Sequence, residues 1–153
     1  MERTQEKRLI MEFKIESSNQ KSQKFLETLM PSIINQLGLT RSKRAVLIKV
    51  TDDPILEGME GATLDMEFAD CYLVLIKRPA RLTKTSLLNM ATTLSHEMVH
   101  VKQLAKGMMK FLPNQNRIWM GKRFTKKTKY LDQPWEIEAF SKQELILRRA
   151  IEI

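Results

Sequence analysis

The sequence predicts the α+β class, with a small mixed sheet packed on two long helices in one compact domain. Three observations support this prediction. Runs of β-branched residues fill the middle third, a long apolar stripe at helical spacing follows them, and a second helical pattern begins at Pro134. The chain of 153 residues is 42% hydrophobic, which fits a single domain over residues 1–153. A chain of this length buries roughly 70% of its unfolded surface, so it can build a core without disulfides.

Alternating residues open the chain. In "LIMEFKI" every second residue is apolar, which predicts a strand within residues 1–16. The charged neighbours leave a helical N-terminal arm open as the alternative. The apolar side chains on one side of the strand are those of Leu9, Met11, Phe13 and Ile15.

A helix is expected next. Ser17 or Ser18 of "SSNQ" can cap its first turn, and Gly38 can end it. Pro31 is expected to kink this helix or to split it in two, because proline lacks the backbone donor that the helix needs. Its apolar face consists of Phe25, Leu26, Leu29, Ile33, Ile34 and Leu37.

Three strands are predicted in the middle third. "RAVLIKV" (44–50) is rich in β-branched residues and ends at the turn "TDDP". "GATLDMEF" (61–68) and "CYLVLIK" (71–77) follow, joined by a tight turn near Ala69 and Asp70. The sheet is therefore expected to be antiparallel in part, and the edge strand is either of the last two.

A long helix follows the strands. Thr83 or Thr85 can cap it and Gly107 can end it. Its buried stripe, at three- and four-residue intervals, is Leu87, Ala91, Leu94, Met98, Val101 and Ala105. The pattern weakens after Met108, where "NRIWMGKRF" (116–124) predicts a hairpin.

The last helix is expected from Pro134 onward. Asp132 or Gln133 can cap it, and proline suits a first helical turn. Its inward residues are expected to be Trp135, Ala139, Phe140, Leu145 and Ile146. Trp119 and Trp135 are interpreted as core anchors.

The long helix carries "HEMVH" with the only two histidines of the chain, His96 and His100. Residues four apart lie on one helical face, so both imidazoles can bind one metal ion. Glu97 lies beside them and can take a proton from a metal-activated water. This pattern predicts a zinc hydrolase site.

The chain has no third histidine to complete such a site. A carboxylate, Cys71 or a group from another chain remains possible. Glu136 and Glu138 of "PWEIEAF" are the best carboxylate candidates, because a second helix can pack against the motif helix.

"HEMVH" followed by "EIEA" resembles the gluzincins, zinc metallopeptidases of thermolysin type, and among them the compact minigluzincins. With "WMGK" and "YLDQPWEIEAF", it also resembles small peptidase-like proteins of bacteriophages, sometimes grouped with SprT-like proteins. The resemblance covers about residues 62–142. It implies a zincin-like fold, endopeptidase activity, Zn²⁺ on His96, His100 and a glutamate, and Glu97 as general base.

The resemblance also ranks the two glutamates. In such families a small residue often follows the ligand glutamate by three positions, so Ala139 favours Glu136 over Glu138. Phe140 stands where several families have Asp or Asn, which leaves the partner of the ligand histidines unassigned. In zincins, an extended substrate pairs with the edge strand beside the motif helix.

A peptidase also needs a donor for the oxyanion of its transition state. The candidates are Tyr130, Tyr72, Arg117 and Arg123, of which we favour Tyr130 because it closely precedes Glu136. An alternative is a deformylase-like metal amidase with Cys71 as ligand, although the glycine-rich motif of deformylases is absent.

The formal net charge of +8 favours acidic partners. The densest basic run offers a possible nucleic-acid contact, so a basic binding module with a catalytically silent zincin fold is a further alternative. Its cations are Lys122, Arg123, Lys126, Lys127 and Lys129. No signal peptide and no membrane span are recognisable, and we expect a cytoplasmic protein.

Overall fold

The computed structural model describes residues 10–152 and confirms the α+β class. Its larger sheet has the strand order β1-β2-β4-β3. β1, β2 and β4 run parallel, whereas β3 runs antiparallel to β4, so the sheet is mixed as predicted. β3 is an edge strand and β4 is an inner one, which answers the question that the sequence left open. The strands are β1 (Phe13–Glu16), β2 (Ala45–Thr51), β3 (Gly61–Met66) and β4 (Cys71–Lys77).

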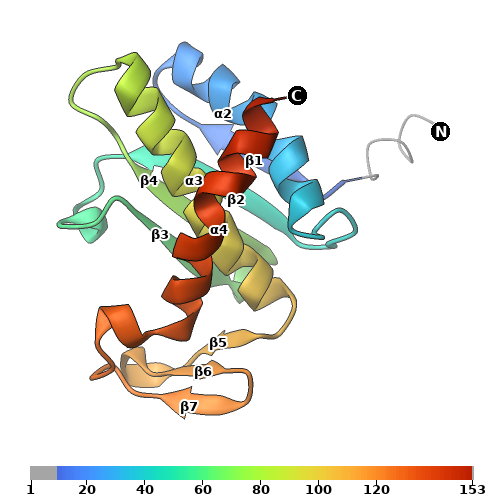
Figure 1. Ribbon diagram of the computed structural model, residues 1–153, viewed down its shortest axis with the longest axis vertical. Helices are drawn as coiled ribbons and strands as arrows, with labels where there is room; N and C mark the ends of the chain where they lie inside the picture. Colours follow the sequence, from blue (N-terminus) through green and yellow to red (C-terminus); the bar gives the residue numbers. More distant parts are fainter. Residues whose placement is uncertain (1–9, 153) are drawn as a thin grey trace.

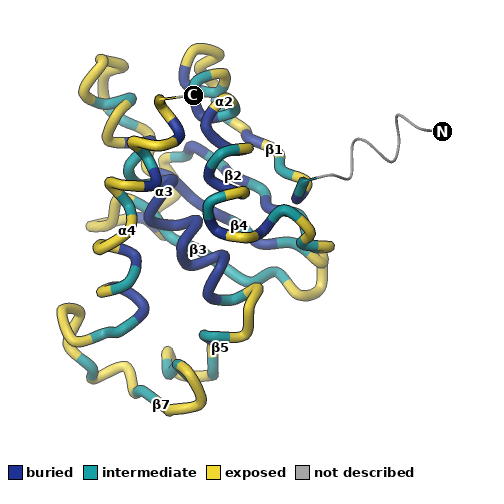
Figure 2. Tube along the Cα trace, turned by 45° about the vertical axis from the view of Figure 1, so that its right-hand side comes forward, coloured by how far each residue is buried: buried dark blue, intermediate teal, exposed yellow. Residues whose placement is uncertain are grey.

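Three helices complete the fold: α2 (Gln20–Gln36), α3 (Lys84–Ala105) and α4 (Pro134–Ile151). α2 and α3 pack on the sheet, and α4 packs on these two helices. α3 contacts β3 and β4, and α4 contacts both α3 and α2. Figure 1 shows α3 and α4 crossing in front of the sheet, with α2 beside the C-terminal half of α4. The most deeply buried segments in Figure 2 are the middle of α3 and the central strands. The core between them includes Ile33, Val46, Ile48, Val74, Ile76, Leu94 and Met98.

The first strand and helix follow the prediction, except for the helix cap and the effect of Pro31. β1 begins at Phe13, and Met11 and Ile15 are buried as expected, while Leu9 lies outside the described residues. α2 is capped by Asn19, not by Ser17 or Ser18: its Oδ1 accepts from the backbone N–H of Ser22 over 3.0 Å. The cap comes later because β1 extends to Glu16, and the chain needs two residues to leave the sheet.

Pro31 does not split α2. The helix continues through it from Gln20 to Gln36, so that part of the prediction is wrong. Pro31 lies on the exposed face, where water can hydrogen-bond the carbonyl that proline leaves without a partner. Gly38 follows the helix end, as expected.

Both ends of α3 are fixed as the sequence predicts. Thr83 caps the first turn in a capping box, in which its hydroxyl and that of Ser86 each accept a backbone N–H. Gly107 has φ +71° and ends the helix, with its N–H bonded to the Leu104 carbonyl and that of Met108 to the Gln103 carbonyl. This firm stop leaves His96 and His100 well inside a regular helix.

Three residues expected to face inward are exposed: Ala105, Phe140 and Leu145. Ala105 lies in the last turn of α3, and the buried stripe of α4 is narrower than the apolar pattern suggests. That stripe consists of Trp135, Glu136, Ala139, Ile146 and Ala150. Phe140 is 50% exposed because it borders the cleft beside the motif, where its ring packs edge-on against His96 at 4.6 Å.

A small antiparallel sheet connects α3 to α4 and lies at the lower end of the molecule in Figure 1. It contains β5 (Met109–Phe111), β6 (Arg117–Trp119) and β7 (Lys122–Phe124). The predicted hairpin over 116–124 is confirmed as β6 and β7, which turn at Met120 and Gly121.

The small sheet has an inner and an outer face. Residues paired across its strands share a face, so Arg117, Trp119 and Phe124 lie together on one side. There Trp119 and Phe124 pack against the ring of Trp135, which is only 2% exposed. The predicted anchoring role of Trp135 is thereby confirmed, and it fixes the small sheet against the start of α4.

Candidate metal centre

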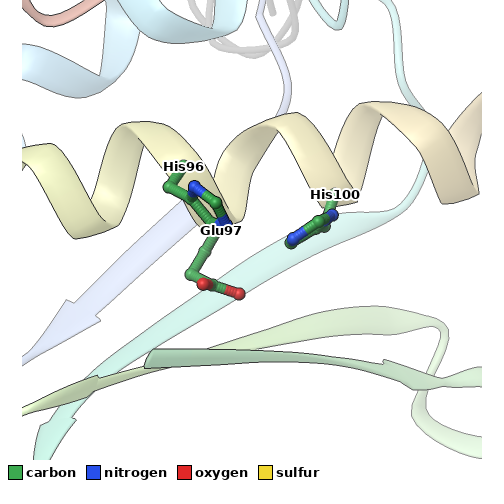
Figure 3. A group of neighbouring side chains, drawn as sticks. All are labelled: His96, Glu97 and His100. Atoms are coloured by element: carbon green, nitrogen blue, oxygen red, sulfur yellow. The ribbon is translucent and has the colours of Figure 1, made fainter. Parts of the chain in front are cut away.

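α3 presents His96, Glu97 and His100 on one side, toward the edge of the larger sheet (Figure 3). Their spacing brings them together because residues three and four apart lie above one another on a helix. All three are buried, with exposed fractions of 8%, 6% and 5%. One potential ligand atom from each lies within 4.8 Å of the others. The three residues therefore form a buried group that could hold a metal ion.

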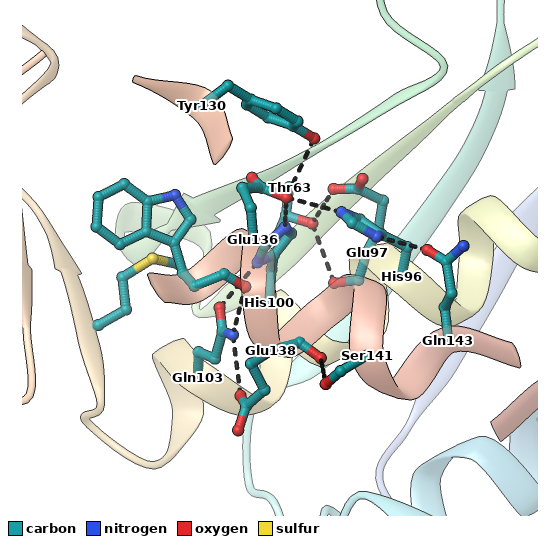
Figure 4. Close-up of polar contacts among 12 residues, drawn as sticks. Thr63, His96, Glu97, His100, Gln103, Tyr130, Glu136, Glu138, Ser141 and Gln143 are labelled. Atoms are coloured by element: carbon teal, nitrogen blue, oxygen red, sulfur yellow. Dashed lines mark hydrogen bonds and ion pairs between the residues drawn. The ribbon is translucent and has the colours of Figure 1, made fainter. Parts of the chain in front are cut away.

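Glu136 approaches the same point from the first turn of α4. Its Oε1 lies 2.8 Å from His96 Nε2 and 3.1 Å from His100 Nε2. Figure 4 shows Glu136 and both histidines converging on this point. Three residues later the fully buried Ala139 lets α4 pack closely on α3. Of the two glutamates named from the sequence, Glu136 is thus the one that reaches the histidines.

Glu138 has a different environment. It forms ion pairs with Lys102 at 3.0 Å and with Lys142 at 3.1 Å, and it accepts from Gln103 Nε2 at 3.0 Å. Burial raises the pKa of Glu138, but these bonds outweigh burial and hold it below its usual value. Glu138 therefore ties α4 to α3 behind the histidines.

Two glutamines hold the histidine rings from behind. His96 Nδ1 lies 2.8 Å from Gln143 Oε1, and His100 Nδ1 lies 2.8 Å from Gln103 Oε1. The amide of Gln103 donates to the Trp135 carbonyl and to Glu138, each at 3.0 Å, so its oxygen must face His100. His100 consequently donates from Nδ1 to Gln103, and its Nε2 points at the site, where a neutral imidazole offers a lone pair.

Reasoning from the sequence missed both glutamines. Gln103 lies one turn after His100 in "HEMVHVKQ", and Gln143 lies two turns after Glu136 on the same face of α4. Helical periodicity from each candidate ligand is the signal that could have found them. They hold the Nδ1 atoms of the two histidines, for which the sequence offered no Asp or Asn partner.

The donor set fits a cation. In the tautomer with the ring proton on Nδ1, His100 Nε2 and Glu136 Oε1 are both acceptors 3.1 Å apart, and a cation at this point would be bound by both. Burial lowers the pKa of His96, but bonding to Glu136 and the nearby charge of Glu97 outweigh it and raise the pKa. Zinc in catalytic sites is bound by three protein donors and keeps one coordination position open. Two imidazole nitrogens and one carboxylate oxygen form such a donor set.

The pKa values of the two carboxylates of the site are shifted in opposite directions. Burial raises the pKa of Glu97, despite the nearby histidines and a bond from Thr63. Burial also acts on Glu136, but its bonds to His100 and His96 hold its pKa well below the usual range. Such divergence distinguishes a proton acceptor from a permanent anion. Thr63, which the sequence did not indicate, donates to Glu97 Oε1 over 2.8 Å.

The motif opens into a cleft of about 800 Å³ between the two sheets. Tyr130 and Arg117 line it opposite the histidines. The Tyr130 hydroxyl donates to Glu136 Oε1 over 3.3 Å, and burial together with Glu136 raises the pKa of Tyr130 to about 12. Burial lowers the pKa of Arg117, but a guanidinium remains charged at any physiological pH. The cleft thus holds two donors that keep their protons.

β3 passes very close to the motif helix. A Cβ on Gly61 would lie 2.6 Å from Thr93 Cγ2, 3.0 Å from the Leu75 carbonyl oxygen and 3.2 Å from Glu97 Cγ. Only glycine permits this approach, which places the start of the edge strand in the wall of the cleft.

The remaining sequence candidates lie elsewhere. Cys71 is half-buried at the start of β4, where its carbonyl accepts from Arg44, and it does not line the cleft. Tyr72 is buried in the core under the guanidinium of Arg44, and Arg123 lies exposed on β7.

Comparisons with models of known protein families, with curated proteins and with solved structures give no match. Among residues 10–152, no helix is both long and apolar enough to cross a membrane. Any assignment of function must therefore rest on the site itself.

Proposed function

We propose that this protein is a zinc-dependent metallopeptidase of gluzincin type, with a zincin-like fold similar to the minigluzincins. The observation behind the proposal is the convergence of His96 Nε2, His100 Nε2 and Glu136 Oε1 on one point, with the Glu97 carboxylate beside it. His96, His100 and Glu136 are the proposed zinc ligands. The two histidines reach the point from one helix and the glutamate from the next, as the gluzincin pattern requires.

A zinc ion bound there would polarise the scissile carbonyl and lower the pKa of an attacking water toward neutrality. Glu97 is the proposed general base. Its raised pKa suits a group that accepts a proton from the water and then delivers it to the leaving amine. Thr63 holds one carboxylate oxygen of Glu97, which leaves the other free to accept that proton.

The oxyanion is the second charge to be stabilised. Tyr130 is the proposed donor because its hydroxyl already points at the site, and its pKa of about 12 keeps it protonated. Arg117 lines the same wall and adds a half-buried positive charge near Glu97 and Glu136. The exposed edge of β3 beside the cleft offers backbone groups to an extended peptide.

The test compares the full chain with its Glu97→Gln variant after both are loaded with zinc. Elemental mass spectrometry measures the metal, and mass spectrometry of a peptide library prepared from a bacterial lysate measures cleavage. We expect about one zinc per chain in both proteins, and hydrolysis at least ~100-fold slower in Glu97→Gln. Absence of bound zinc in the wild type, or equal hydrolysis by both proteins, would contradict the proposal.

A further inference from the structure

One strongly charged surface lies beside the cleft and has no role in the chemistry above. Its cations lie on β7 and in the loop that follows, and we call residues 122–129 the basic segment. All of its cations are exposed, and none forms an ion pair within residues 10–152. They are Lys122, Arg123, Lys126, Lys127 and Lys129, with no acidic residue among them. Five unpaired positive charges in so short a segment attract an anionic partner.

The basic segment is connected to two residues that line the cleft, one by strand pairing and one along the chain. Phe124 pairs across the hairpin with Arg117, which lines the cleft. At the other end, Lys129 directly precedes Tyr130, whose hydroxyl reaches Glu136. Between them, the backbone N–H of Lys126 donates to Asn116 Oδ1 over 3.2 Å, which holds the loop against the start of β6. Residues 122–129 do not themselves line the cleft, but a molecule that extends past Arg117 or Tyr130 reaches the residues to which they are connected.

The aromatic residues near these cations are already engaged. The Phe124 ring packs edge-on against Trp135, with centroids 5.6 Å apart and planes at 89°. Tyr130 is half exposed, but it directs its hydroxyl into the cleft and packs edge-on against Phe140, with centroids 6.0 Å apart. Single-stranded nucleic acids are held by stacking of bases on free aromatic faces as well as by charge. The basic segment offers charge without such faces, which favours an acidic polypeptide over a nucleic acid.

The wall of the cleft at the start of β3 carries a negative charge. There the lining includes Glu60, next to Gly61 at the start of β3, whereas the wall formed by the small sheet carries Arg117. Glu60 is exposed and forms no ion pair among the described residues. A substrate with acidic residues on one side of the scissile bond therefore has one favourable direction in the cleft.

We propose that the basic segment binds an acidic stretch of the polypeptide substrate, on the side of the scissile bond that lies over β6 and β7. The proposal rests on the peptidase function and names its substrate class. An extended peptide advances about 3.3 Å per residue, so the acidic residues are expected within a few positions of the cleaved bond. Such long-range attraction raises the rate of encounter more than it strengthens any single contact.

The first test measures binding and requires no hydrolysis. Fluorescence anisotropy follows a labelled oligoglutamate, an uncharged Gly-Ser peptide of equal length, and a single-stranded oligonucleotide of equal charge. Zinc-loaded Glu97→Gln is the background for two charge reversals: Lys126→Glu/Lys127→Glu, and the control Lys21→Glu/Lys24→Glu on the exposed surface of α2. We expect salt-sensitive binding of oligoglutamate that weakens at least about ten-fold in the first reversal only.

Two results of the binding test would overturn the proposal. One is equal binding of oligoglutamate and the Gly-Ser peptide. The other is binding of the oligonucleotide at least as tight as that of oligoglutamate, which would identify the basic segment as a nucleic-acid site.

The second test maps cleavage sites of the active chain in the same peptide library. We expect Asp and Glu to be enriched on one side of the cleaved bonds, and this enrichment to disappear in Lys126→Glu/Lys127→Glu but not in the control. Cleavage without enrichment would overturn this inference and leave the peptidase intact. No cleavage by the wild type would instead overturn the peptidase function, and with it the substrate role of the basic segment.

Discussion

The hydroxyl of Thr63 donates a hydrogen bond to Glu97 Oε1 over 2.8 Å, from the edge strand of the sheet to the motif helix. The proposed general base is thereby held by a neighbour that contacts neither histidine. Glu97 is only 6% exposed, so little water can take the place of this donor. This contact links the position of β3 to the geometry of the reaction.

Removal of that hydroxyl should slow the chemical step. In Thr63→Val the side chain keeps its shape but cannot donate, and a loosely held base is out of position for part of the time. We expect kcat to fall about ten-fold with KM and zinc content nearly unchanged. Thr63→Ser restores the donor and should recover most of the rate. If Val and Ser are equally slow, the contact affects packing alone.

Variants of Glu136 and of Glu138 should differ in their zinc content. Glu136→Gln removes the carboxylate that meets both histidines, so we expect bound zinc to fall from about one per chain to nearly none. Glu138→Gln should keep the zinc, because Glu138 faces Lys102 and Lys142. Elemental mass spectrometry of the two purified variants, side by side, measures the difference. Loss of zinc in Glu138→Gln alone would mean that Glu138, and not Glu136, is the ligand.

The glutamines behind the histidines should tune zinc affinity. Gln103→Leu and Gln143→Leu remove the acceptors that fix the ring protons on Nδ1. We expect each change to weaken zinc binding about 10- to 100-fold, measured by competition with a chromophoric chelator. Gln20→Leu, at the exposed start of α2, is the control and should bind zinc as the wild type does. Equal affinities in all three would show that the glutamines do not orient the ligands.

Gly61→Ala should destabilise the fold. The new Cβ would lie 2.6 Å from Thr93 Cγ2, so β3 or α3 must shift, at a cost of about 1–3 kcal/mol in the free energy of unfolding. Urea titration measures this loss. Adding Thr93→Ser removes the clashing methyl group and should recover part of the stability. No recovery in the double variant would assign the cost to the Leu75 carbonyl, 3.0 Å away.

The motif helix could be predicted from the sequence because its evidence is local. Four-residue spacing places His96 and His100 on one face of any helix, and the resemblance to gluzincins, through the small Ala139, favoured Glu136 as the proposed ligand on the second helix. The proposed partners of these residues depend on which elements meet in space. Thr63 reaches Glu97 only because β3 lies at the sheet edge beside α3, and no local pattern contains the strand order.

The errors have the same origin. Apolar periodicity placed Phe140 and Leu145 in the core, although the first borders the cleft and both are about half exposed. A helix that lines a cleft exposes apolar residues which the pattern cannot distinguish from core residues. The cap at Asn19 in place of Ser17 or Ser18 shows the same limit, since the preceding strand determines where the helix begins.

The small sheet lies within the chain segment that separates the last histidine from Glu136, and these two residues are 36 positions apart. A metal ion that joined them would act as a cross-link, closing a loop that contains β5, β6 and β7. Cross-links of this kind remove chain entropy from the unfolded state, by more for longer loops. Occupancy of the metal centre would then govern how often the hairpin opens, and amide hydrogen exchange in residues 109–124 would report on a metal bound outside that segment.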